Sequence, residues 1–504
     1  MPFVPTNATI RTGDSWTNAL MNTLASDLQT AFTSVPATDM ADPLTMTQDI
    51  NGSNRALYGF RTYIGTVPDP THGIVDATSH GMSESATGAV NANALQVAIN
   101  SLPSYGGAIC IPPGTYTIDP GIELDGSSGG VRSAVELFGF GDSTLLKLTA
   151  ASAAIPLFSF GSGAQTTVRN LRIDGQNTLQ TGVSRGAFET SGTSVACMIE
   201  NVTVENYLGY AVKVEPSSSF FRIHRCRLEA TDATIYLVAA IGQTAPGYTS
   251  IHGCQITGSQ HGIFMFGGVS STVIRACNIT GCGAYGIFFQ TSQMQSIDKV
   301  SIIGCHISGC QKGMYFYNTQ NSAIPNTEHI RYVTVTGSTI SSSTEQGIFF
   351  HSTAAAASND LYTSQIRHCT FNGNIISRNA GIGIDTTKLL TENPPVADSI
   401  FAANILYANN DGIKIHGPSD IQGTFGQRMQ RNSIFGNCSF DDRGSDATQG
   451  YDVILLKAQT AALYVTKHTV VANCVDGTDT FASDLTGIYD TGYQTDIGHN
   501  AGND

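Results

Sequence analysis

Residues 251–266 read IHGCQITGSQHGIFMF, residues 274–290 read IRACNITGCGAYGIFFQ, and residues 302–317 read IIGCHISGCQKGMYFY. The three stretches share two half-phrases. The first half-phrase consists of an apolar residue, two spacer residues, a small or apolar residue, one spacer residue and a final apolar residue. The second half-phrase is Gly-apolar-x-apolar. Within each half the apolar positions alternate with period two, as in strands that bury one face. So small a unit cannot bury its apolar side alone, so neighbouring copies must stack.

Copies of both half-phrases recur at intervals of roughly 23 to 35 residues. The first half-phrase reads Val135-Phe138-Phe140, Val168-Leu171-Ile173, Ile199-Val202-Val204, Ile223-Cys226-Leu228, Ile251-Cys254-Ile256, Ile274-Cys277-Ile279, Ile302-Cys305-Ile307, Val335-Ser338-Ile340, Ile366-Cys369-Phe371, Phe401-Asn404-Leu406 and Met429-Asn432-Ile434. The second half-phrase begins at Gly262, Gly286, Gly313, Gly347, Gly381 and Gly412.

This pattern predicts an all-β chain folded as a right-handed, single-stranded parallel β-helix of roughly 11 or more rungs. The two spacers indicate a bend, where Gly253, Gly304 and Gly337 stand in three copies. No long helical pattern separates the copies, so turns and loops must connect the strands. Loops of variable length at the corners are where we expect a functional site.

Composition narrows the function. The chain has 504 residues, 53 glycines, 13% charged residues and a net charge of −14. This charge argues against nucleic-acid binding and against binding to anionic membranes. No apolar run reaches membrane-spanning length, so we expect no membrane insertion. The first residues lack the basic-then-apolar pattern of a secretion signal, which favours assembly inside a cell.

Eleven cysteines could form disulfides or a zinc site, and the spacings Cys277-x4-Cys282 and Cys305-x4-Cys310 suggest four thiolates. The repeat register favours another explanation: one inward position needs a small buried side chain in every rung. That position is occupied by Cys226, Cys254, Cys277, Cys305 and Cys369, and by Ser338 and Asn404 in other rungs.

Residues 1–70 lack the repeat, and we expect them to form an attachment segment and linker. One apolar face of a predicted helix carries Trp16, Leu20, Leu24, Leu28 and Phe32. This face either docks to another subunit or assembly, or packs onto the start of the β-helix. Residues 71–475 are predicted to form the β-helix, and residues 476–504 a C-terminal cap or tail.

A short helix at 94–99 (ALQVAI) is followed by GGAICIPPGTYTI at 106–118. This opening resembles the pectate-lyase-like (pectin lyase superfamily) β-helix that is common in bacteriophage tailspikes and tail fibres. In that family an acidic G-D-G-x-x-D-D-T run usually stands nearby, whereas residues 77–84 here read ATSHGMSE. No functional residue is therefore carried over from that run.

The resemblance implies a homotrimer that binds a host surface polysaccharide and usually cleaves it. It also implies contact with other phage tail proteins through the N-terminal segment, and a place in the virion tail after assembly in the host cytoplasm. No cofactor, metal or nucleic-acid partner is implied.

Two outward columns follow from the second half-phrase, because alternate residues after its Gly must point away from the core. The first column is Lys213, Tyr236, Phe264, Phe288, Tyr315, Phe349, Gly383 and Lys414. The second column is Glu215, Val238, Phe266, Gln290, Tyr317, His351, Asp385 and His416. So many outward aromatic residues need an explanation.

The columns could pack against other protomers or under a loop, which we favour, or they could floor a glycan groove. Within a groove, sugar rings would lie on aromatic rings while polar groups bind hydroxyls. The expected substrate-binding residues are Gln290, Tyr315, Tyr317, Phe349, His351, Lys414 and His416.

Glycoside hydrolysis needs two carboxyl groups, about 5–5.5 Å apart for retention or about 6.5–9.5 Å apart for inversion. Neighbouring rungs are about 5 Å apart, so stacked carboxylates fit. The catalytic candidates are Glu345, Asp385 and Asp411. A second acidic cluster is expected from Glu189, Glu200, Glu205 and Glu215.

We therefore expect a tailspike that binds and hydrolyses a host polysaccharide. One alternative is a receptor-binding or structural spike without catalysis. Another is a lyase that acts on a uronate-containing glycan, with Lys414 and His416 near the substrate carboxylate.

Overall fold

In the computed structural model, described residues cover 74–125, 134–149, 155–161, 165–176, 185–190, 194–238, 247–291, 295–319, 329–353, 366–386, 396–416 and 428–440, with short strands beyond. The chain divides into two units, Met1–Val67 and Pro68–Asp504. The predicted attachment helix lies outside the described residues. None of the helices in the described part has the length and apolarity that a membrane span requires.

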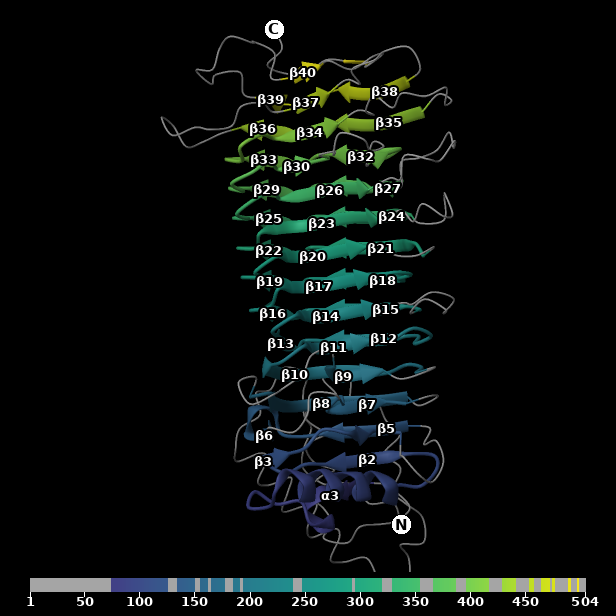
Figure 1. Ribbon diagram of the computed structural model, residues 1–504, viewed down its shortest axis with the longest axis vertical. Coiled ribbons are helices and arrows are strands. Elements are labelled where there is room, and N and C mark those ends of the chain that lie inside the picture. The colour runs from purple at the N-terminus through teal and green to yellow at the C-terminus, as the bar shows by residue number, and fades with distance from the viewer. Residues whose placement is uncertain are drawn as a thin grey trace, which may run out of the picture. The chain divides into compact units, whose positions relative to one another are not determined.

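Short parallel strands wind into a coil, and each strand pairs with its equivalent one turn later (Figure 1). The second of its two sheets has 13 strands in the described residues, in chain order. These strands are β4 (Ile122–Glu123), β7 (Phe158–Phe160), β9 (Gly186–Thr190), β11 (Tyr210–Val214), β14 (Ala233–Val238), β17 (His261–Phe266), β20 (Tyr285–Gln290), β23 (Lys312–Thr319), β26 (Ile348–Thr353), β30 (Ile384–Asp385), β34 (Ile413–His416), β37 (Val453–Leu456) and β40 (Ile488–Asp490). The predicted parallel β-helix is confirmed.

The first sheet contains two runs of strands that meet at a bend. The first run comprises β1 (Ile74–Asp76), β2 (Gly107–Cys110), β5 (Ala134–Phe138), β8 (Gln165–Asp174), β10 (Met198–Tyr207), β12 (Phe221–His224), β15 (Thr249–His252), β18 (Ser270–Arg275), β21 (Ile297–Ile303), β24 (Ile330–Thr336), β27 (Ile366–Arg367), β28 (Thr370–Asn372), β31 (Val396–Ala397), β32 (Ser399–Ala402), β35 (Arg428–Phe435), β38 (Tyr464–Val471) and β41 (Asp496–Ile497). The second run comprises β3 (Gly114–Ile118), β6 (Thr144–Leu148), β13 (Arg227–Ala230), β16 (Gln255–Thr257), β19 (Asn278–Thr280), β22 (His306–Ser308), β25 (Thr339–Ser341), β29 (Ile375–Ser377), β33 (Ile405–Tyr407), β36 (Cys438–Phe440) and β39 (Cys474–Val475), and β8 and β10 extend into it.

The bend between these runs needs a left-handed backbone. Gly253 and Gly304 adopt φ values of +65° and +59° there, as their position in the phrase predicts. In other rungs Arg225 and Ala276 adopt φ values of +53° and +50° at the same bend. A non-glycine residue at such a φ is strained, so stacking of each rung on its neighbours must hold the bend in place.

Helix α3 (Gly88–Ser101) lies across the N-terminal end of the coil (Figure 1). Its buried face, which includes Leu95 and Ile99, covers the first rungs. The amide of Gln96 exchanges two hydrogen bonds with the backbone of Glu123, one at 2.8 Å and one at 3.1 Å. These bonds satisfy edge groups of β4, so the helix seals an end that would otherwise pair with another chain. The predicted capping helix is confirmed. Two 3₁₀ turns, η1 (Ala77–His80) and η2 (Gly141–Ser143), complete this region.

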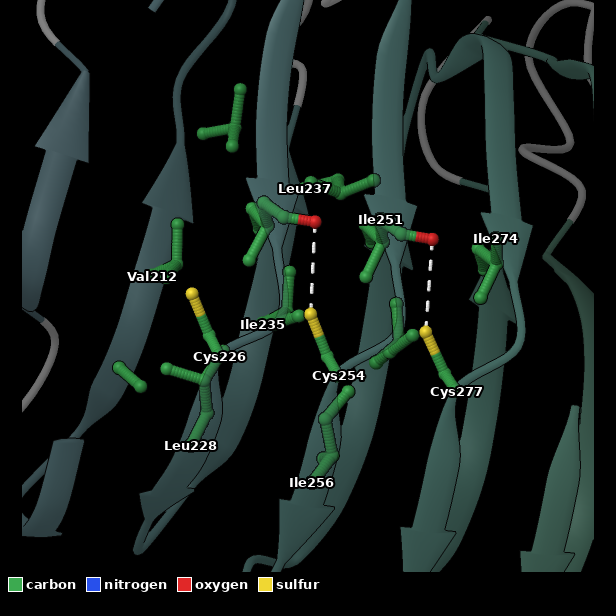
Figure 2. Close-up of a cluster of buried hydrophobic side chains, with 14 of the residues drawn as sticks. Val212, Cys226, Leu228, Ile235, Leu237, Ile251, Cys254, Ile256, Ile274 and Cys277 are labelled. Atoms are coloured by element: carbon green, nitrogen blue, oxygen red, sulfur yellow. Dashed lines mark hydrogen bonds between the residues drawn. The ribbon is translucent and has the colours of Figure 1, made fainter. Parts of the chain in front are cut away.

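The interior is built from columns of equivalent residues. Cys226, Cys254 and Cys277 come from successive rungs and point into the apolar core (Figure 2). The thiol of Cys254 donates to the carbonyl of Ile223 at 3.6 Å, and the thiol of Cys277 to that of Ile251 at 3.6 Å. None of the described cysteines forms a disulfide, and no metal-binding group of three or more residues is found in the described residues.

Asparagine continues this cysteine column toward the C-terminus. Asn374, Asn404 and Asn437 occupy the position after Cys305 and Ser338. The amide of Asn374 donates to Asn404 at 2.9 Å, and that of Asn404 donates to Asn437 at 2.9 Å. The oxygen of each asparagine also accepts a backbone N–H from the preceding rung. Buried polar groups at the bend are therefore paired with one another along the coil.

Three predicted register positions are wrong. Cys369 lies opposite Val333, in a separate column with Ser399 and Asn432. Asn432 likewise belongs to this column and not to that of Asn404. In the first rungs Leu137, and not Val135, aligns with Val168, which leaves Phe140 43% exposed. Around Cys369 and Asn432 the cause is that one coil contains more than one stretch like the first half-phrase. In the first rungs the corner is longer, because Leu137 and Leu146 are nine residues apart and pair with Val168 and Ile173, which are five apart.

A further correction concerns the glycine that opens the second half-phrase. A Cβ on Gly347 would lie 2.7 Å from the carbonyl oxygen of Gly383, and one on Gly313 would lie 2.6 Å from that of Gly347. Close backbone approach thus explains the glycine column. The column passes through Gly383, because Ile348 pairs with Ile384. The prediction that Gly381 belongs to it is wrong.

Candidate functional site

The second sheet carries an outward aromatic column, defined here as Tyr236, Phe264, Phe288, Tyr315 and Phe349. Strands β14, β17, β20, β23 and β26 place these residues in direct register. Successive ring centroids are 5.0, 4.7, 5.1 and 5.2 Å apart. The first outward column predicted from the glycine phrase is confirmed over these rungs.

Ring orientation changes how this column can be used. The planes of adjacent rings differ by only 11–30°, so the rings stack face against face along the coil. As a result Phe288 is only 6% exposed and Tyr315 only 9% exposed. Offset stacking contributes roughly 0.5–1.5 kcal/mol per pair beyond area burial. The inner rings of the column therefore offer edges, and not faces, to a ligand.

Lys312 lies at the start of β23, beside the C-terminal part of the column. Its Nζ is 5.7, 5.8 and 5.3 Å from the ring centroids of Tyr285, Tyr315 and Phe349. It also forms an ion pair with Glu345. The lysine is only 9% exposed, so three rings and one carboxylate surround its ammonium group.

Glu345 is held in its charged form. The hydrogen bond from Lys312 lowers the pKa of Glu345, and a second from Gln311 (Nε2 to Oε1, 2.6 Å) acts in the same direction, against partial burial. Its side chain is 40% exposed. The site thus contains a solvent-accessible carboxylate that is ionised near neutral pH and can accept a proton or a hydroxyl hydrogen bond.

A second outward column runs beside the first. Phe266, Gln290, Tyr317 and His351 pair in register, as predicted. The ring of His351 stacks on that of Tyr317 at 5.1 Å, and its Nδ1 lies 2.8 Å from the hydroxyl of Tyr315. Burial, with a smaller contribution from Lys312, lowers the pKa of His351. The imidazole is therefore neutral at pH 7.

Asp385 belongs to the first column and not to the second, because β30 pairs Asp385 with Phe349. Its other neighbour in register is Lys414 on β34. Asp385 is 2% exposed, and its Oδ2 lies 3.5 Å from Nε2 of Gln346. This carboxylate thus follows directly after the last ring of the aromatic column.

The three predicted catalytic carboxylates are not stacked on one another. The Glu345 carboxylate contacts Lys312, whose Nζ lies near the Tyr315 and Phe349 rings, and Asp385 is two rungs beyond Tyr315. Asp385 lies one rung beyond Phe349, whereas Glu345 stands four residues before Phe349 and turns its carboxylate toward Lys312 of the preceding rung.

The rest of this end of the site lies on β34 and just before it. Asp411 is half-buried, three residues before Lys414, so it lies roughly 10 Å along the strand from the position opposite Asp385. His416 pairs through its backbone with Leu456, and its side chain lies outside the described residues.

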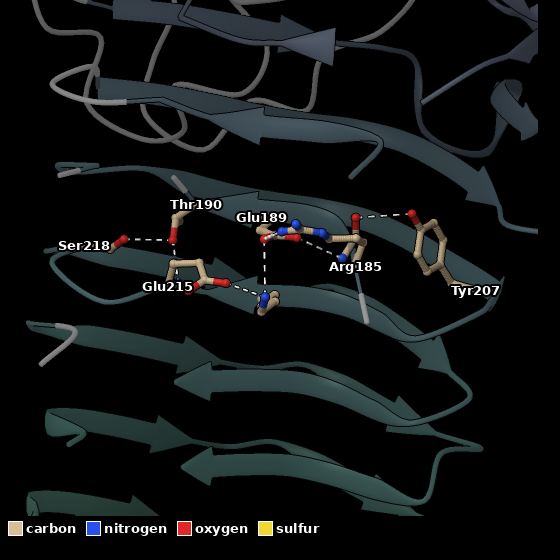
Figure 3. Close-up of polar contacts among 8 residues, drawn as sticks. Arg185, Glu189, Thr190, Tyr207, Glu215 and Ser218 are labelled. Carbon is tan, nitrogen blue, oxygen red and sulfur yellow. Dashed lines mark hydrogen bonds and ion pairs between the residues drawn. The ribbon is translucent and has the colours of Figure 1, made fainter. Parts of the chain in front are cut away.

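A polar cluster at the other end of the column was only half predicted (Figure 3). Glu189 is 4% exposed and bonds to Arg185 Nη1 at 2.6 Å and to Lys213 Nζ at 3.4 Å. Lys213 also pairs with Glu215. The expected four-glutamate cluster divides between two sheets, since Glu205 pairs with Arg172 and Glu200 with His224.

An open groove of 830 Å³ lies on the first sheet, away from these residues. Its lining includes Tyr105, Glu136, Gln165, Thr167, Met198 and Arg222. Nothing in the repeat pattern singles out this groove, because it arises where small residues such as Ala108 and Ala134 leave room between larger ones.

Comparison with known proteins identifies the fold. A family model described as right handed beta helix region matches residues 185–489. No curated protein sequence matches this chain. Similar solved structures include the A-module of mannuronan C-5 epimerase AlgE6 from Azotobacter vinelandii, with 15% identity, a TM-score of 0.55, and coverage of 85% of this chain and 98% of that one. The N-terminal fragment of bacteriophage Phi29 gene product 12 has 12% identity and a TM-score of 0.54, covering 85% and 73%. The Dettilon tailspike protein has 12% identity and a TM-score of 0.50, covering 73% and 68%.

Proposed function

The chain belongs to the right-handed β-helix family, and from this premise we propose that it is a tailspike that binds and hydrolyses a polysaccharide of a host cell surface. The observation that carries the proposal is the presence of two carboxyl groups at the Phe349 end of the aromatic column: Asp385 pairs with Phe349 in register, and Glu345 pairs with Lys312, whose Nζ lies 5.3 Å from the Phe349 ring. A structure named as a tailspike and a structure named as a mannuronan epimerase are among those with the same fold.

Binding would use the polar end of the aromatic face. Phe349 is the last ring of the column, so its far side is not stacked on another ring of the column. Gln290, Tyr317 and His351 follow one another in the second column and can exchange hydrogen bonds with sugar hydroxyls. An apolar surface with a few convergent polar groups is typical of a carbohydrate site.

Hydrolysis would divide the work between the two carboxyl groups. Glu345, ionised and solvent-accessible, would take a proton from a water molecule as that water attacks the anomeric carbon. Asp385, in its protonated form, would give a proton to the leaving glycosidic oxygen as the carbon–oxygen bond breaks, and because it is 2% exposed this step requires its side chain to turn toward the substrate. With the two carboxyl groups on different rungs and a water between them, the reaction would invert configuration, which requires a separation of about 6.5–9.5 Å in the complex.

Assembly follows the resemblance to tailspikes. The protein would form a homotrimer, attached to other tail proteins of the virion through residues 1–70. The apolar column would then lie either in the glycan groove or against a neighbouring protomer. Measurement of the mass in solution tests the trimer, and the same measurement on a chain lacking residues 1–70 tests whether that segment is needed.

The activity is tested with purified surface polysaccharides of candidate hosts. Shortened products with new reducing ends support hydrolysis, whereas absorbance near 235 nm would indicate elimination and support the lyase.

Asp385→Asn and Glu345→Gln should each reduce cleavage by at least about a hundredfold without loss of the fold. Asp411→Asn tests the third candidate. Glu205→Gln, which breaks a comparable ion pair on the other sheet, is the matched control. Full activity in both Asp385→Asn and Glu345→Gln would overturn the assignment.

A receptor-binding spike without catalysis is the second candidate. The self-stacked rings and the ion-paired Glu345 favour it, because both are complete without a ligand. Binding of a polysaccharide with no change in its length after prolonged incubation would support this function over hydrolysis.

A further inference from the structure

We infer that the aromatic face selects neutral glycans and rejects uronate-rich ones. The inference rests on the proposed function and names the substrate class of the same site. It is drawn from how Arg185, Lys213 and Lys312, three of the four cationic groups of this face, are engaged, since a uronate carboxylate needs a cation to offset its charge when it leaves water.

Lys312 is the cation nearest the Phe349 end of the column. Its ammonium group pairs with Glu345 and lies among the rings of Tyr285, Tyr315 and Phe349. With 9% exposure it has little surface left for a ligand. A substrate carboxylate would have to displace Glu345, and the displaced carboxylate would then repel it.

Lys213 is engaged in the same way at the opposite end of the face. Glu189 and Glu215 both form ion pairs with its ammonium group, and Glu189 forms a further ion pair with Arg185. The backbone N–H of Glu215 donates to the hydroxyl of Thr190 at 2.7 Å, which fixes this strand end in place. Two carboxylates therefore share one lysine, and the cluster has no surplus positive charge to offer.

The charge of the whole face points the same way. Among the described residues from 185 to 416 on this face, carboxylates outnumber cationic groups. The carboxylates are Asp232, Glu189, Glu215, Glu345, Asp385 and Asp411, and the cationic groups are Arg185, Lys213, Lys312 and Lys414. Like charges placed together across an interface cost binding energy, so a polyuronate is repelled. Sugar hydroxyls can instead donate to Glu215 and Glu345, which are 27% and 40% exposed.

The test is a binding panel of purified bacterial surface polysaccharides, one half with neutral repeating units and the other with uronate in every repeat, together with mannuronan. We expect binding only among neutral members, with affinities that change little with salt, and at least about tenfold weaker binding to every uronate polymer. Tight, salt-sensitive binding to a uronate polymer would overturn this inference and leave the proposed function standing. Binding to no member would overturn both.

A charge variant tests the same inference by comparing mannuronan binding between the parent protein and a single substitution. Glu215→Gln removes one of the two carboxylates around Lys213 and should raise affinity for mannuronan several-fold. Glu205→Gln, which releases Arg172 on the other sheet, is the matched control and should leave mannuronan binding unchanged. Equal effects of the two variants would show a non-specific response to net charge and would also overturn the inference.

Discussion

The hydroxyl of Tyr315 lies 2.8 Å from Nδ1 of His351, one rung further along the second sheet. This contact joins the two outward columns and fixes the imidazole plane beside Tyr317. Tyr315→Phe keeps the stacked ring and removes only the hydrogen bond. We expect glycan affinity to fall about three- to tenfold, because the ligand must now order His351, while the free energy of unfolding changes by about 1 kcal/mol or less.

Isothermal titration with a bound polysaccharide measures the affinity, and chemical denaturation measures the stability. Tyr332→Phe is the control, because Tyr332 is 48% exposed on the first sheet. Unchanged affinity in Tyr315→Phe would exclude His351 from the binding surface.

Acid should destabilise the fold through its half-buried histidines. Burial lowers the pKa of His261 and of His351 below the ordinary value of 6.5. The unfolded chain therefore binds more protons than the folded one in this range, so stability is present above pH 6.5 and is lost as the pH falls below it. We expect the melting temperature to drop progressively from pH 7 toward pH 5.

His261→Phe and His351→Phe should flatten that dependence. His306→Phe makes the same change at an exposed position of β22 and should not. Identical pH profiles for all three variants and the parent would contradict the prediction.

The asparagine column should contribute strongly to stability. Asn404 donates to Asn437 and to the carbonyl of Phe371, and its oxygen accepts from the amide of Asn374. Asn404→Ala leaves these buried partners unsatisfied, which should cost about 2–4 kcal/mol. Denaturant unfolding measures this loss. Asn372→Ala, at an exposed position in the neighbouring rung, is the control and should stay within about 0.5 kcal/mol of the parent.

The sequence alone predicts the coil and most of its columns, because one buried face per strand imposes a period of two. Cys254, Cys277 and Cys305 lie inside, and Phe264, Phe288 and Tyr315 lie outside, as the phrase predicts. Register within a coil is less certain. Ile366-Cys369-Phe371 and Phe371-Asn374-Ile376 both match the first half-phrase, and only strand pairing shows that Asn374 follows Ser338.

The site is predicted less well than the fold. Asp385 appears in the wrong column because GIGID offers two glycines, and the sequence does not show which one belongs to the glycine column; the pairing of Ile348 with Ile384 identifies Gly383. Ring planes and ion pairs depend on rotamers, which periodicity does not encode. Lys312 stands before the Gly of its phrase, outside both columns, so nothing in the pattern marks its contacts with Glu345 and three rings.

The cysteine column and the separate Cys369 should be chemically inert in the folded protein. Hydrogen bonding between neighbouring thiols, together with burial, raises the pKa of Cys254 and of Cys277 to about 12, and burial raises that of Cys369 to about 12. Only the thiolate reacts with Ellman's reagent, so at pH 8 these groups should not react until the chain unfolds. The chain has eleven cysteines, and nine of those in the described residues are buried. The two cysteines outside this buried set are Cys438 and Cys474. We expect no more than two thiols to react in the native protein and all eleven in denaturant. Rapid native labelling of the peptide that contains Cys254, identified by mass spectrometry, would mean that the thiols do not lie inside the coil.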